Sequence, residues 1–155
     1  SNWHAPYHEQ LMTLLMRARR RFGSAVLIDC HSMPSLAPGI RARRGGGQAD
    51  VVLGDRFGVS AEAGVVDAIE AAFVDAGLRV TRNAPFAGGY ITERYGRPAA
   101  GVSAVQIEID RALYLDEERV QPGARFERFK SSLGPVIERL CALGGGPGAS
   151  ALAAE

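Results

Sequence analysis

The feature that most constrains this fold is the alternation of helical periodicity with short, strongly apolar runs. Apolar residues recur at helical spacing over residues 5–22, 65–73 and 126–140. Runs expected to form strands lie between and around these helical segments: 25–28, 50–54, 78–82 and 103–109. Helices interleaved with such strands predict an α/β domain with a mixed, mostly parallel sheet flanked by helices.

Local signals set the expected boundaries of these elements. Ser60 is expected to cap the second helix, and Gly77 stands where a glycine commonly ends one. Gly134-Pro135 is expected to kink or split the last helix, because proline removes a backbone donor and crowds the preceding turn. Residues 32–49 and 83–102 are rich in glycine and proline and are expected to be long loops.

Length and composition bound the class of protein. The 155 residues fit one domain, which we place at residues 3–143 and follow with a flexible Gly/Ala-rich tail at 144–155. An apolar content of 46% with a net charge of +1 excludes a wholly disordered chain and argues against a strongly basic nucleic-acid-binding protein. No uncharged apolar run is long enough to span a membrane. With two cysteines and no disulfide framework, a cytoplasmic setting is the default.

His31 ends the first expected strand, in the sequence Asp29-Cys30-His31-Ser32. Neutral imidazole is a common zinc ligand, and a neighbouring carboxylate often fixes its tautomer. Asp29 is a candidate for that carboxylate, with the reservation that adjacent strand residues face opposite ways. The alternative is a histidine that forms a structural hydrogen bond and has no catalytic role.

Glu108 lies inside an otherwise apolar strand. A carboxylate buried at such a site is costly unless it is paired or linked to a metal, and a carboxylate held in this way suits a general base. The alternative is a strand with one solvated face, along which Gln106, Glu108 and Asp110 meet water.

Weaker signals lie elsewhere in the chain. Residues 83–92 contain paired glycines that would let the backbone approach a ligand closely, although an irregular connection explains them equally. His4 and His8 have the i, i+4 spacing of a metal pair, but no glutamate follows His4 as the HExxH motif requires. The arginines at 17–21 and 41–44 are interpreted as solvated faces.

Several stretches occur in the order of the motifs of one family, the N-formylglutamate amidohydrolases, which this sequence resembles over most of residues 3–120. The matching stretches are Tyr7-His8 with the following helix, LIDCHSMP (27–34), ADVVLGDRFG (49–58), NAPFAGGYIT (83–92), YG (95–96), VQIEIDR (105–111) and LYLDE (113–117). Motifs in a shared order are far more specific than any one of them alone.

The resemblance implies a fold like that of the zinc carboxypeptidases (the phosphorylase/hydrolase-like fold). It also implies an enzyme of histidine breakdown that uses Zn²⁺ to hydrolyse N-formyl-L-glutamate to formate and L-glutamate. His31 would then be a zinc ligand and Glu108 the general base. Residues implied to bind the substrate are Arg56, Asn83, Gly88, Gly89, Tyr90, Thr92, Arg94 and Arg111.

The same resemblance predicts an incomplete site. Members of the family are longer, and their other zinc ligands, a histidine and an acidic residue, come from an N-terminal half that has no counterpart in this sequence. Catalytic zinc usually has three protein ligands, so we expect a weakly active or inactive fragment whose unpaired sheet edge favours self-association. The alternatives are a non-catalytic carboxylate-binding module of the same fold and a related amidohydrolase for another N-acyl amino acid.

Overall fold

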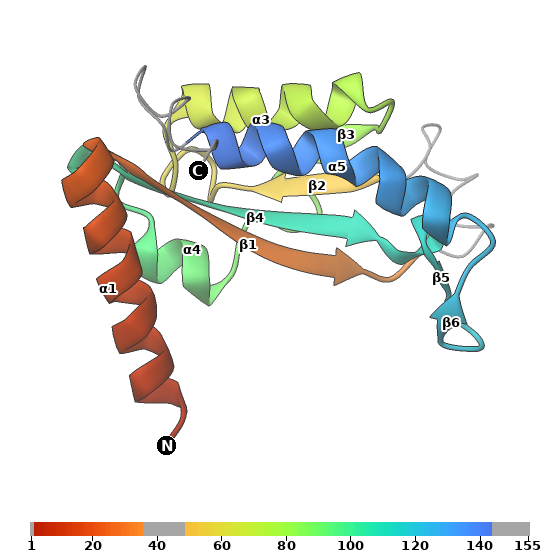
Figure 1. Cartoon of the computed structure of the whole chain (residues 1–155), viewed down its shortest axis with the longest axis horizontal. Helices are drawn as coiled ribbons and strands as arrows, with labels where there is room; N and C mark the ends of the chain where they lie inside the picture. The colour runs from red at the N-terminus through yellow and green to blue at the C-terminus, as the bar shows by residue number, and fades with distance from the viewer. Residues whose placement is uncertain (1, 36–48, 144–155) are drawn as a thin grey trace, which may run out of the picture.

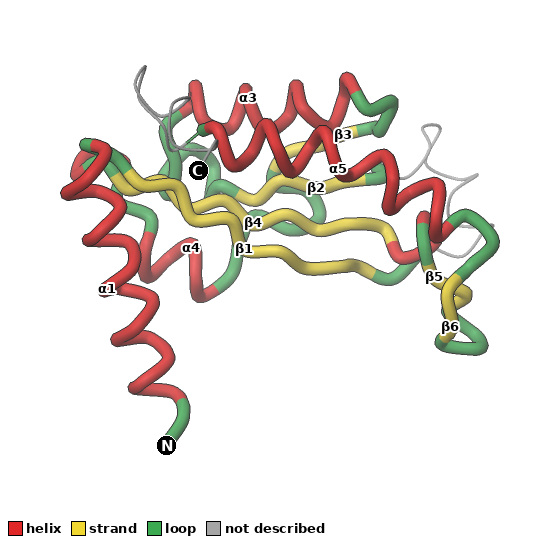
Figure 2. The backbone as a smooth tube through the Cα atoms, in the orientation of Figure 1, coloured by secondary structure: helices red, strands yellow, loops and turns green. Residues whose placement is uncertain are grey.

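The computed structural model describes residues 2–35 and 49–143. Figure 1 shows the arrangement of its helices and strands, and Figure 2 separates them by type. The elements are α1 (His4–Phe22), β1 (Ala25–Met33), β2 (Val51–Gly54), α3 (Ala63–Asp75), β3 (Val80–Arg82), α4 (Tyr90–Tyr95), β4 (Val102–Asp110), β5 (Leu115–Asp116), β6 (Gln121–Pro122) and α5 (Phe126–Ala142), with short 3-10 helices at Pro98–Ala100 and Arg111–Leu113.

The main sheet has four strands in the order β1-β4-β2-β3. β1 is parallel to β4 and β2 is parallel to β3, whereas β2 and β4 are antiparallel. This confirms the expected α/β class with a mixed, mostly parallel sheet. Helices α3 and α5 lie together over the sheet, while α1 and α4 lie on the opposite side (Figure 1).

Alternate residues of the central strands point to these two sides. Leu53, Val105 and Ile107 are buried in a core with α3 and α5, to which Ile69 of α3 and Val136 of α5 belong. A smaller core joins the other side of the sheet to α1 and α4 through the buried residues Leu15, Ala25, Tyr95 and Val102. Gln106, Glu108 and Asp110 of β4 therefore face the side of α1 and α4, because neighbouring strand residues point to opposite faces.

Two expected boundaries are wrong. β1 extends to Met33 because it pairs with β4 along its whole length, from Ala25 with Val102 to Met33 with Asp110. The segment 83–102, expected to be one loop, contains α4 and a 3-10 helix. Residues 36–48, which hold most of the other expected loop and the arginines at 41–44, lie outside the described residues, as does the expected tail at 144–155.

Two local signals were also misread. α3 begins at Ala63 with Glu62 at its N-cap, and Ser60 instead donates its hydroxyl to the Ala104 carbonyl at 2.8 Å. α5 is not split, although Pro135 lies inside it. Val136 is 2% exposed in the core beneath α5, and we attribute the unbroken helix to this packing, which offsets the lost backbone bond. Gly77 does follow the end of α3, with a φ of +80°.

α1 confirms the expected helix but not the expected burial of its apolar side. Leu15 is buried, whereas Tyr7 is 59%, Leu14 57% and Phe22 40% exposed. Met12 on the same helix is 39% exposed. Periodicity shows that a helix has an apolar side, but it does not show what covers that side. No helix of the described residues is long and apolar enough to cross a membrane.

Candidate functional site

The pairing of β1 with β4 brings His31 and Glu108 together. The two residues are Cα partners in the parallel register, and Asp29 and Gln106 are partners one step earlier along the same face. Register partners in neighbouring strands point to the same side of a sheet. Four polar side chains therefore share the face of the sheet that α1 and α4 occupy. β1 and β4 are far apart in the sequence, and no local pattern indicates that they pair.

Contacts within this group fix two of its side chains. His31 Nε2 lies 3.0 Å from Asp29 Oδ2, and Gln106 Nε2 donates to Glu108 Oε1 at 2.8 Å. Asp29 therefore contacts the imidazole as proposed, and the reservation about strand direction does not apply, because residues two apart point the same way. The contact with Asp29 is equally what the hydrogen-bonded-histidine alternative predicts.

Burial separates the residues of this face. Gln106 is 7%, Glu108 8% and Asp110 2% exposed, so the alternative of a solvated strand face is wrong. The His31 side chain is 48% exposed. Cys30 stands between Asp29 and His31 in the sequence. Burial and, to a smaller extent, the Asp29 carboxylate raise the pKa of its thiol. A raised pKa disfavours the thiolate and therefore any role for Cys30 as a nucleophile. The open imidazole next to a buried carboxylate is the feature that a reaction site needs.

The paired glycines bring the segment before α4 against this face. A Cβ on Gly54 would lie 2.5 Å from the Gly88 nitrogen, and one on Gly89 would lie 3.2 Å from Gln106 Oε1. Gly88 has a φ of +115°, in the region that favours glycine. The glycines thus permit close contact between this segment and the sheet, beside the amide that holds Glu108.

Tyr90 and Thr92 belong to the first turn of α4, which follows these glycines. Thr92 is completely buried, and its hydroxyl donates to the Gly89 carbonyl at 2.8 Å. Tyr90 is 51% exposed, and its hydroxyl accepts a hydrogen bond from Arg94 Nη1 at 3.0 Å. Of the two side chains, only that of Tyr90 is exposed enough to contact a ligand.

The arginines implied to bind the substrate lie at separate places. Arg111 donates from Nε to Ser32 Oγ and from Nη2 to the Ser32 carbonyl, both at 3.2 Å, next to His31. Arg56 Nη2 lies 3.7 Å from Glu93 Oε1. Arg94 lies over the ring of Tyr90. Arg111 is therefore the arginine tied to the strand that carries His31, and the other two are near α4.

Asn83 makes contacts that fix the turn after β2. Its Oδ1 accepts the backbone N–H groups of Asp55 at 3.1 Å and Phe57 at 3.2 Å, and its Nδ2 donates to Asp55 Oδ1 at 2.6 Å. Gly54, just before this turn, pairs with Gln106 rather than with the carboxyl end of β4. The carboxyl ends of β2 and β3 therefore lie away from the carboxyl end of β4, because β2 and β3 run antiparallel to β4.

A buried histidine–tyrosine pair joins α1 to α4. His8 Nδ1 lies 2.6 Å from the Tyr95 hydroxyl, and the His4 ring centroid is 4.3 Å from that of His8. Burial, then His4, then Arg94 lower the pKa of His8. His4 and His8 have the spacing of a metal pair, but one of the two His8 ring nitrogens is engaged by the Tyr95 hydroxyl. The Tyr7-His8 motif marks the α1 side of this contact in the sequence, but it does not identify Tyr95 of α4 as the partner of His8.

The donor set of the described chain does not match a catalytic zinc site. Across residues 2–35 and 49–143, no group of three or more His, Cys, Asp or Glu side chains is placed to hold a metal ion. His31 is next to Asp29 and Glu108, but one imidazole is short of the three protein ligands that catalytic zinc usually has. These residues alone do not fit the metal that the family resemblance implies.

Comparisons with known proteins place the chain in a family. The family model described as N-formylglutamate amidohydrolase matches residues 1–115. The N-formylglutamate deformylases of Pseudomonas aeruginosa and Pseudomonas putida are 36% and 35% identical to this chain. Their matches cover 73% and 72% of this chain but only 42% and 41% of the relatives' own length. The crystal structure of N-formylglutamate amidohydrolase from Ralstonia eutropha JMP134 matches with a TM-score of 0.74 and 32% identity, over 90% of this chain and 49% of that one.

The chain thus spans less than half the length of these relatives. The match to the family model nevertheless includes both strands that bear His31 and Glu108. This chain belongs to the N-formylglutamate amidohydrolase family.

Proposed function

We propose that this chain carries part of the active site of an amidohydrolase that releases formate from N-formyl-L-glutamate. The observation that carries the proposal is the buried Glu108 carboxylate beside the half-exposed His31 on one face of the sheet. Relatives over 30% identical are named N-formylglutamate deformylases. A place in histidine breakdown belongs to the same proposal and rests on the family resemblance, and a cytoplasmic setting is proposed from the two cysteines without a disulfide framework.

Glu108 is the general base in this proposal. Gln106 holds one carboxylate oxygen through its side-chain amide, so the carboxylate has a fixed direction. Glu108 takes a proton from the attacking water as the water oxygen bonds to the formyl carbon. It returns that proton to the amine nitrogen as the C–N bond breaks, which releases formate and the free amino acid.

His31 and Arg111 orient the reacting groups. Asp29 fixes the His31 ring through Nε2, and Arg111 is held at the end of the same strand by Ser32. Arginine binds carboxylates through paired N–H groups, so Arg111 is the first candidate for the carboxylate of the substrate. Arg56, Arg94 and Tyr90 remain candidates at the α4 side, and Asn83, Gly88, Gly89 and Thr92 shape the backbone around them.

Zinc is proposed as the cofactor of the complete family site, where it would activate water and polarise the formyl oxygen. Among the described residues His31 is the one ligand that we propose, so we expect weak zinc binding and slow turnover. That shortage of ligands favours a second candidate function, a non-catalytic module that binds small carboxylates. A preference for another N-acyl amino acid is a variant of the first proposal.

Formate release tests the proposal. The chain at high concentration, with zinc added, is incubated with N-formyl-L-glutamate, N-acetyl-L-glutamate and N-formyl-L-methionine, and product is measured. Glu108→Gln is expected to abolish release while calorimetry still detects substrate binding. Glu138→Gln makes the same chemical change on exposed α5 and is expected to have no effect. Equal rates for the chain and Glu108→Gln would reject the catalytic role, and binding without any release would favour the module.

A further inference from the structure

Glu108 fixes the orientation of the side-chain amide of Gln106. Both side chains are buried, at 8% and 7% exposed, and Gln106 Nε2 donates to Glu108 Oε1 at 2.8 Å. An ionised carboxylate offers acceptors only, so the amide nitrogen has to face it and the amide oxygen has to point elsewhere. One end of this amide is therefore committed to the proposed general base.

The other end of the same amide lies against Gly89. A Cβ on Gly89 would lie 3.2 Å from Gln106 Oε1, and among the described residues this is the one heavy atom within 4 Å, apart from the neighbours of Gly89 in the chain. Gly89 has a φ of −107° and a ψ of −156°, which is extended backbone that other residues also adopt. The backbone therefore does not require glycine here, and the contact with Gln106 is what a side chain at this position would disturb.

The segment that carries Gly89 is held in place by two other parts of the chain. The Arg56 N–H donates to the Ala87 carbonyl at 2.7 Å. The Thr92 hydroxyl donates to the Gly89 carbonyl at 2.8 Å. Because hydrogen bonds fix the segment on both sides, a methyl group added at Gly89 is expected to displace the Gln106 amide rather than the segment.

We infer that Gln106 is a positioning residue that links residues 87–89 to the Glu108 carboxylate. Closely packed interiors are stiff and transmit displacements, so a shift of the segment moves the amide, and the amide changes the direction of the carboxylate. The backbone before α4 and the general base are thereby placed together. The role of Glu108 as the base rests on the proposed function, whereas the link through Gln106 rests on these contacts.

The ¹³C signal of the Glu108 carboxyl group tests the link. The chain is labelled with ¹³C at the side-chain carboxyl groups of glutamate, and the Glu108 signal is identified by its loss in Glu108→Gln. Gln106→Ala removes the hydrogen bond and is expected to shift the signal at pH 7. Gly89→Ala is expected to shift it in the same direction by part of that amount, although the added methyl group meets Gln106 and not Glu108.

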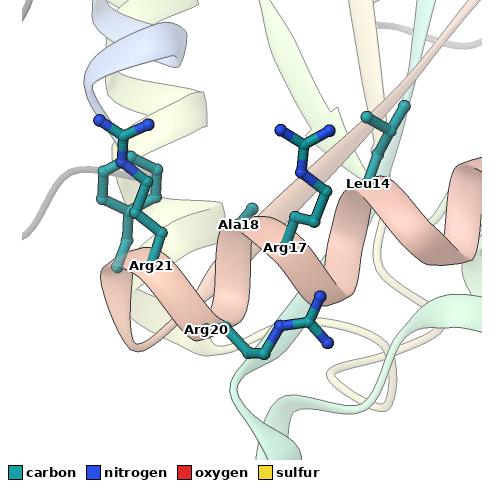
Figure 3. Close-up of a pocket in the computed structure, with 6 residues that line it drawn as sticks. Leu14, Arg17, Ala18, Arg20 and Arg21 are labelled. Carbon is teal, nitrogen blue, oxygen red and sulfur yellow. The ribbon is translucent and has the colours of Figure 1, made fainter.

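Three controls separate the link from a general disturbance. In Gln106→Ala a methyl group at Gly89 has no amide to displace, so the double variant is expected to give the signal of Gln106→Ala alone. Gly64→Ala makes the same change in α3, where a Cβ meets nothing within 4 Å, and should leave the signal in place. Arg20→Ala removes a charge whose guanidinium group extends outward from α1 (Figure 3), and should also leave it in place.

The Glu108 signal also decides against the link. A signal that does not move in folded Gly89→Ala overturns it, as does a second, equal shift when Gly89→Ala is added to Gln106→Ala. If Gln106→Ala does not fold, the comparison of Gly89→Ala with Gly64→Ala still decides.

Formate release separates this inference from the proposed function. Gly89→Ala is expected to lower kcat about tenfold and to leave KM within about twofold, because a small misplacement of a catalytic group is costly. A rise in KM alone would place Gly89 at the substrate rather than at the base, and would overturn the positioning role. Release that Glu108→Gln does not change would instead reject the proposed function, and the Glu108 signal would then decide the link by itself.

Discussion

Replacing Gly54 with alanine tests how closely the segment before α4 lies against the sheet. The added Cβ would lie 2.5 Å from the Gly88 nitrogen, 2.7 Å from the Ala87 carbonyl carbon and 2.9 Å from the Gly88 Cα. All three are backbone atoms, so no side chain can rotate away to make room. The segment over Gln106 would have to move off the sheet, together with the start of α4.

The size of the effect follows from that geometry. Overpacking a well-packed site typically costs about 1–3 kcal/mol, and a clash with backbone on three sides belongs at the upper end. We expect Gly54→Ala to lower the free energy of unfolding by about 3 kcal/mol, which corresponds to a fall in Tm of about 10 °C for a domain of this size. Gly64→Ala is the matched control. A Cβ there meets nothing within 4 Å, and Gly64 lies in α3.

Urea denaturation followed by circular dichroism measures both variants. Alanine is the better helix former by about 0.5–1 kcal/mol, so Gly64→Ala should raise the free energy of unfolding by up to that amount. The same substitution is thus expected to lower the free energy of unfolding at Gly54 and to raise it at Gly64. A loss below about 0.5 kcal/mol for Gly54→Ala would refute the close approach of this segment to the sheet.

Three further changes test the site and the contact between α1 and α4 by urea denaturation. Glu108→Gln should raise the free energy of unfolding by about 1 kcal/mol at pH 7, because it removes a charge from a buried position kept for function. Tyr95→Phe should lower it by about 1–2 kcal/mol, because the His8 Nδ1 loses its partner at 2.6 Å. The folded chain lowers the pKa of His8 through burial, His4 and Arg94, so the unfolded chain binds the proton more readily. Stability should therefore fall as the pH drops below about 6.5, the ordinary value for histidine, and His8→Gln should reduce that fall.

Sequence reasoning found the strands of the site but not their register. The apolar run before His31 and the alternation around Glu108 are local signals, and a strand forms at each, although β1 continues beyond the apolar run to Met33. That the two residues are register partners depends on a pairing between segments far apart in the chain. The antiparallel direction of β2, which separates Asn83 from the carboxyl end of β4, likewise has no local signal.

Tertiary context overrode the local rules elsewhere. Ser60 has the chemistry of a helix cap but is used to hold the Ala104 carbonyl of β4. Pro135 should end a helix but lies within α5, beside the buried Val136. The short helix α4 lies among glycines, proline and aromatics that indicate a loop. In each case a contact with a distant element decides the outcome, and a short window of sequence does not contain that element.

Zinc content after dialysis is the most direct test of the proposal that the described residues supply only part of a zinc site. The purified chain is equilibrated with zinc, dialysed against zinc-free buffer and analysed by mass spectrometry of the metal. With His31 as the one ligand proposed among the described residues, we expect far less than one zinc per chain to remain, and His31→Ala to remove the weak binding expected before dialysis. One tightly held zinc per chain, with normal formate release from N-formyl-L-glutamate, would contradict this.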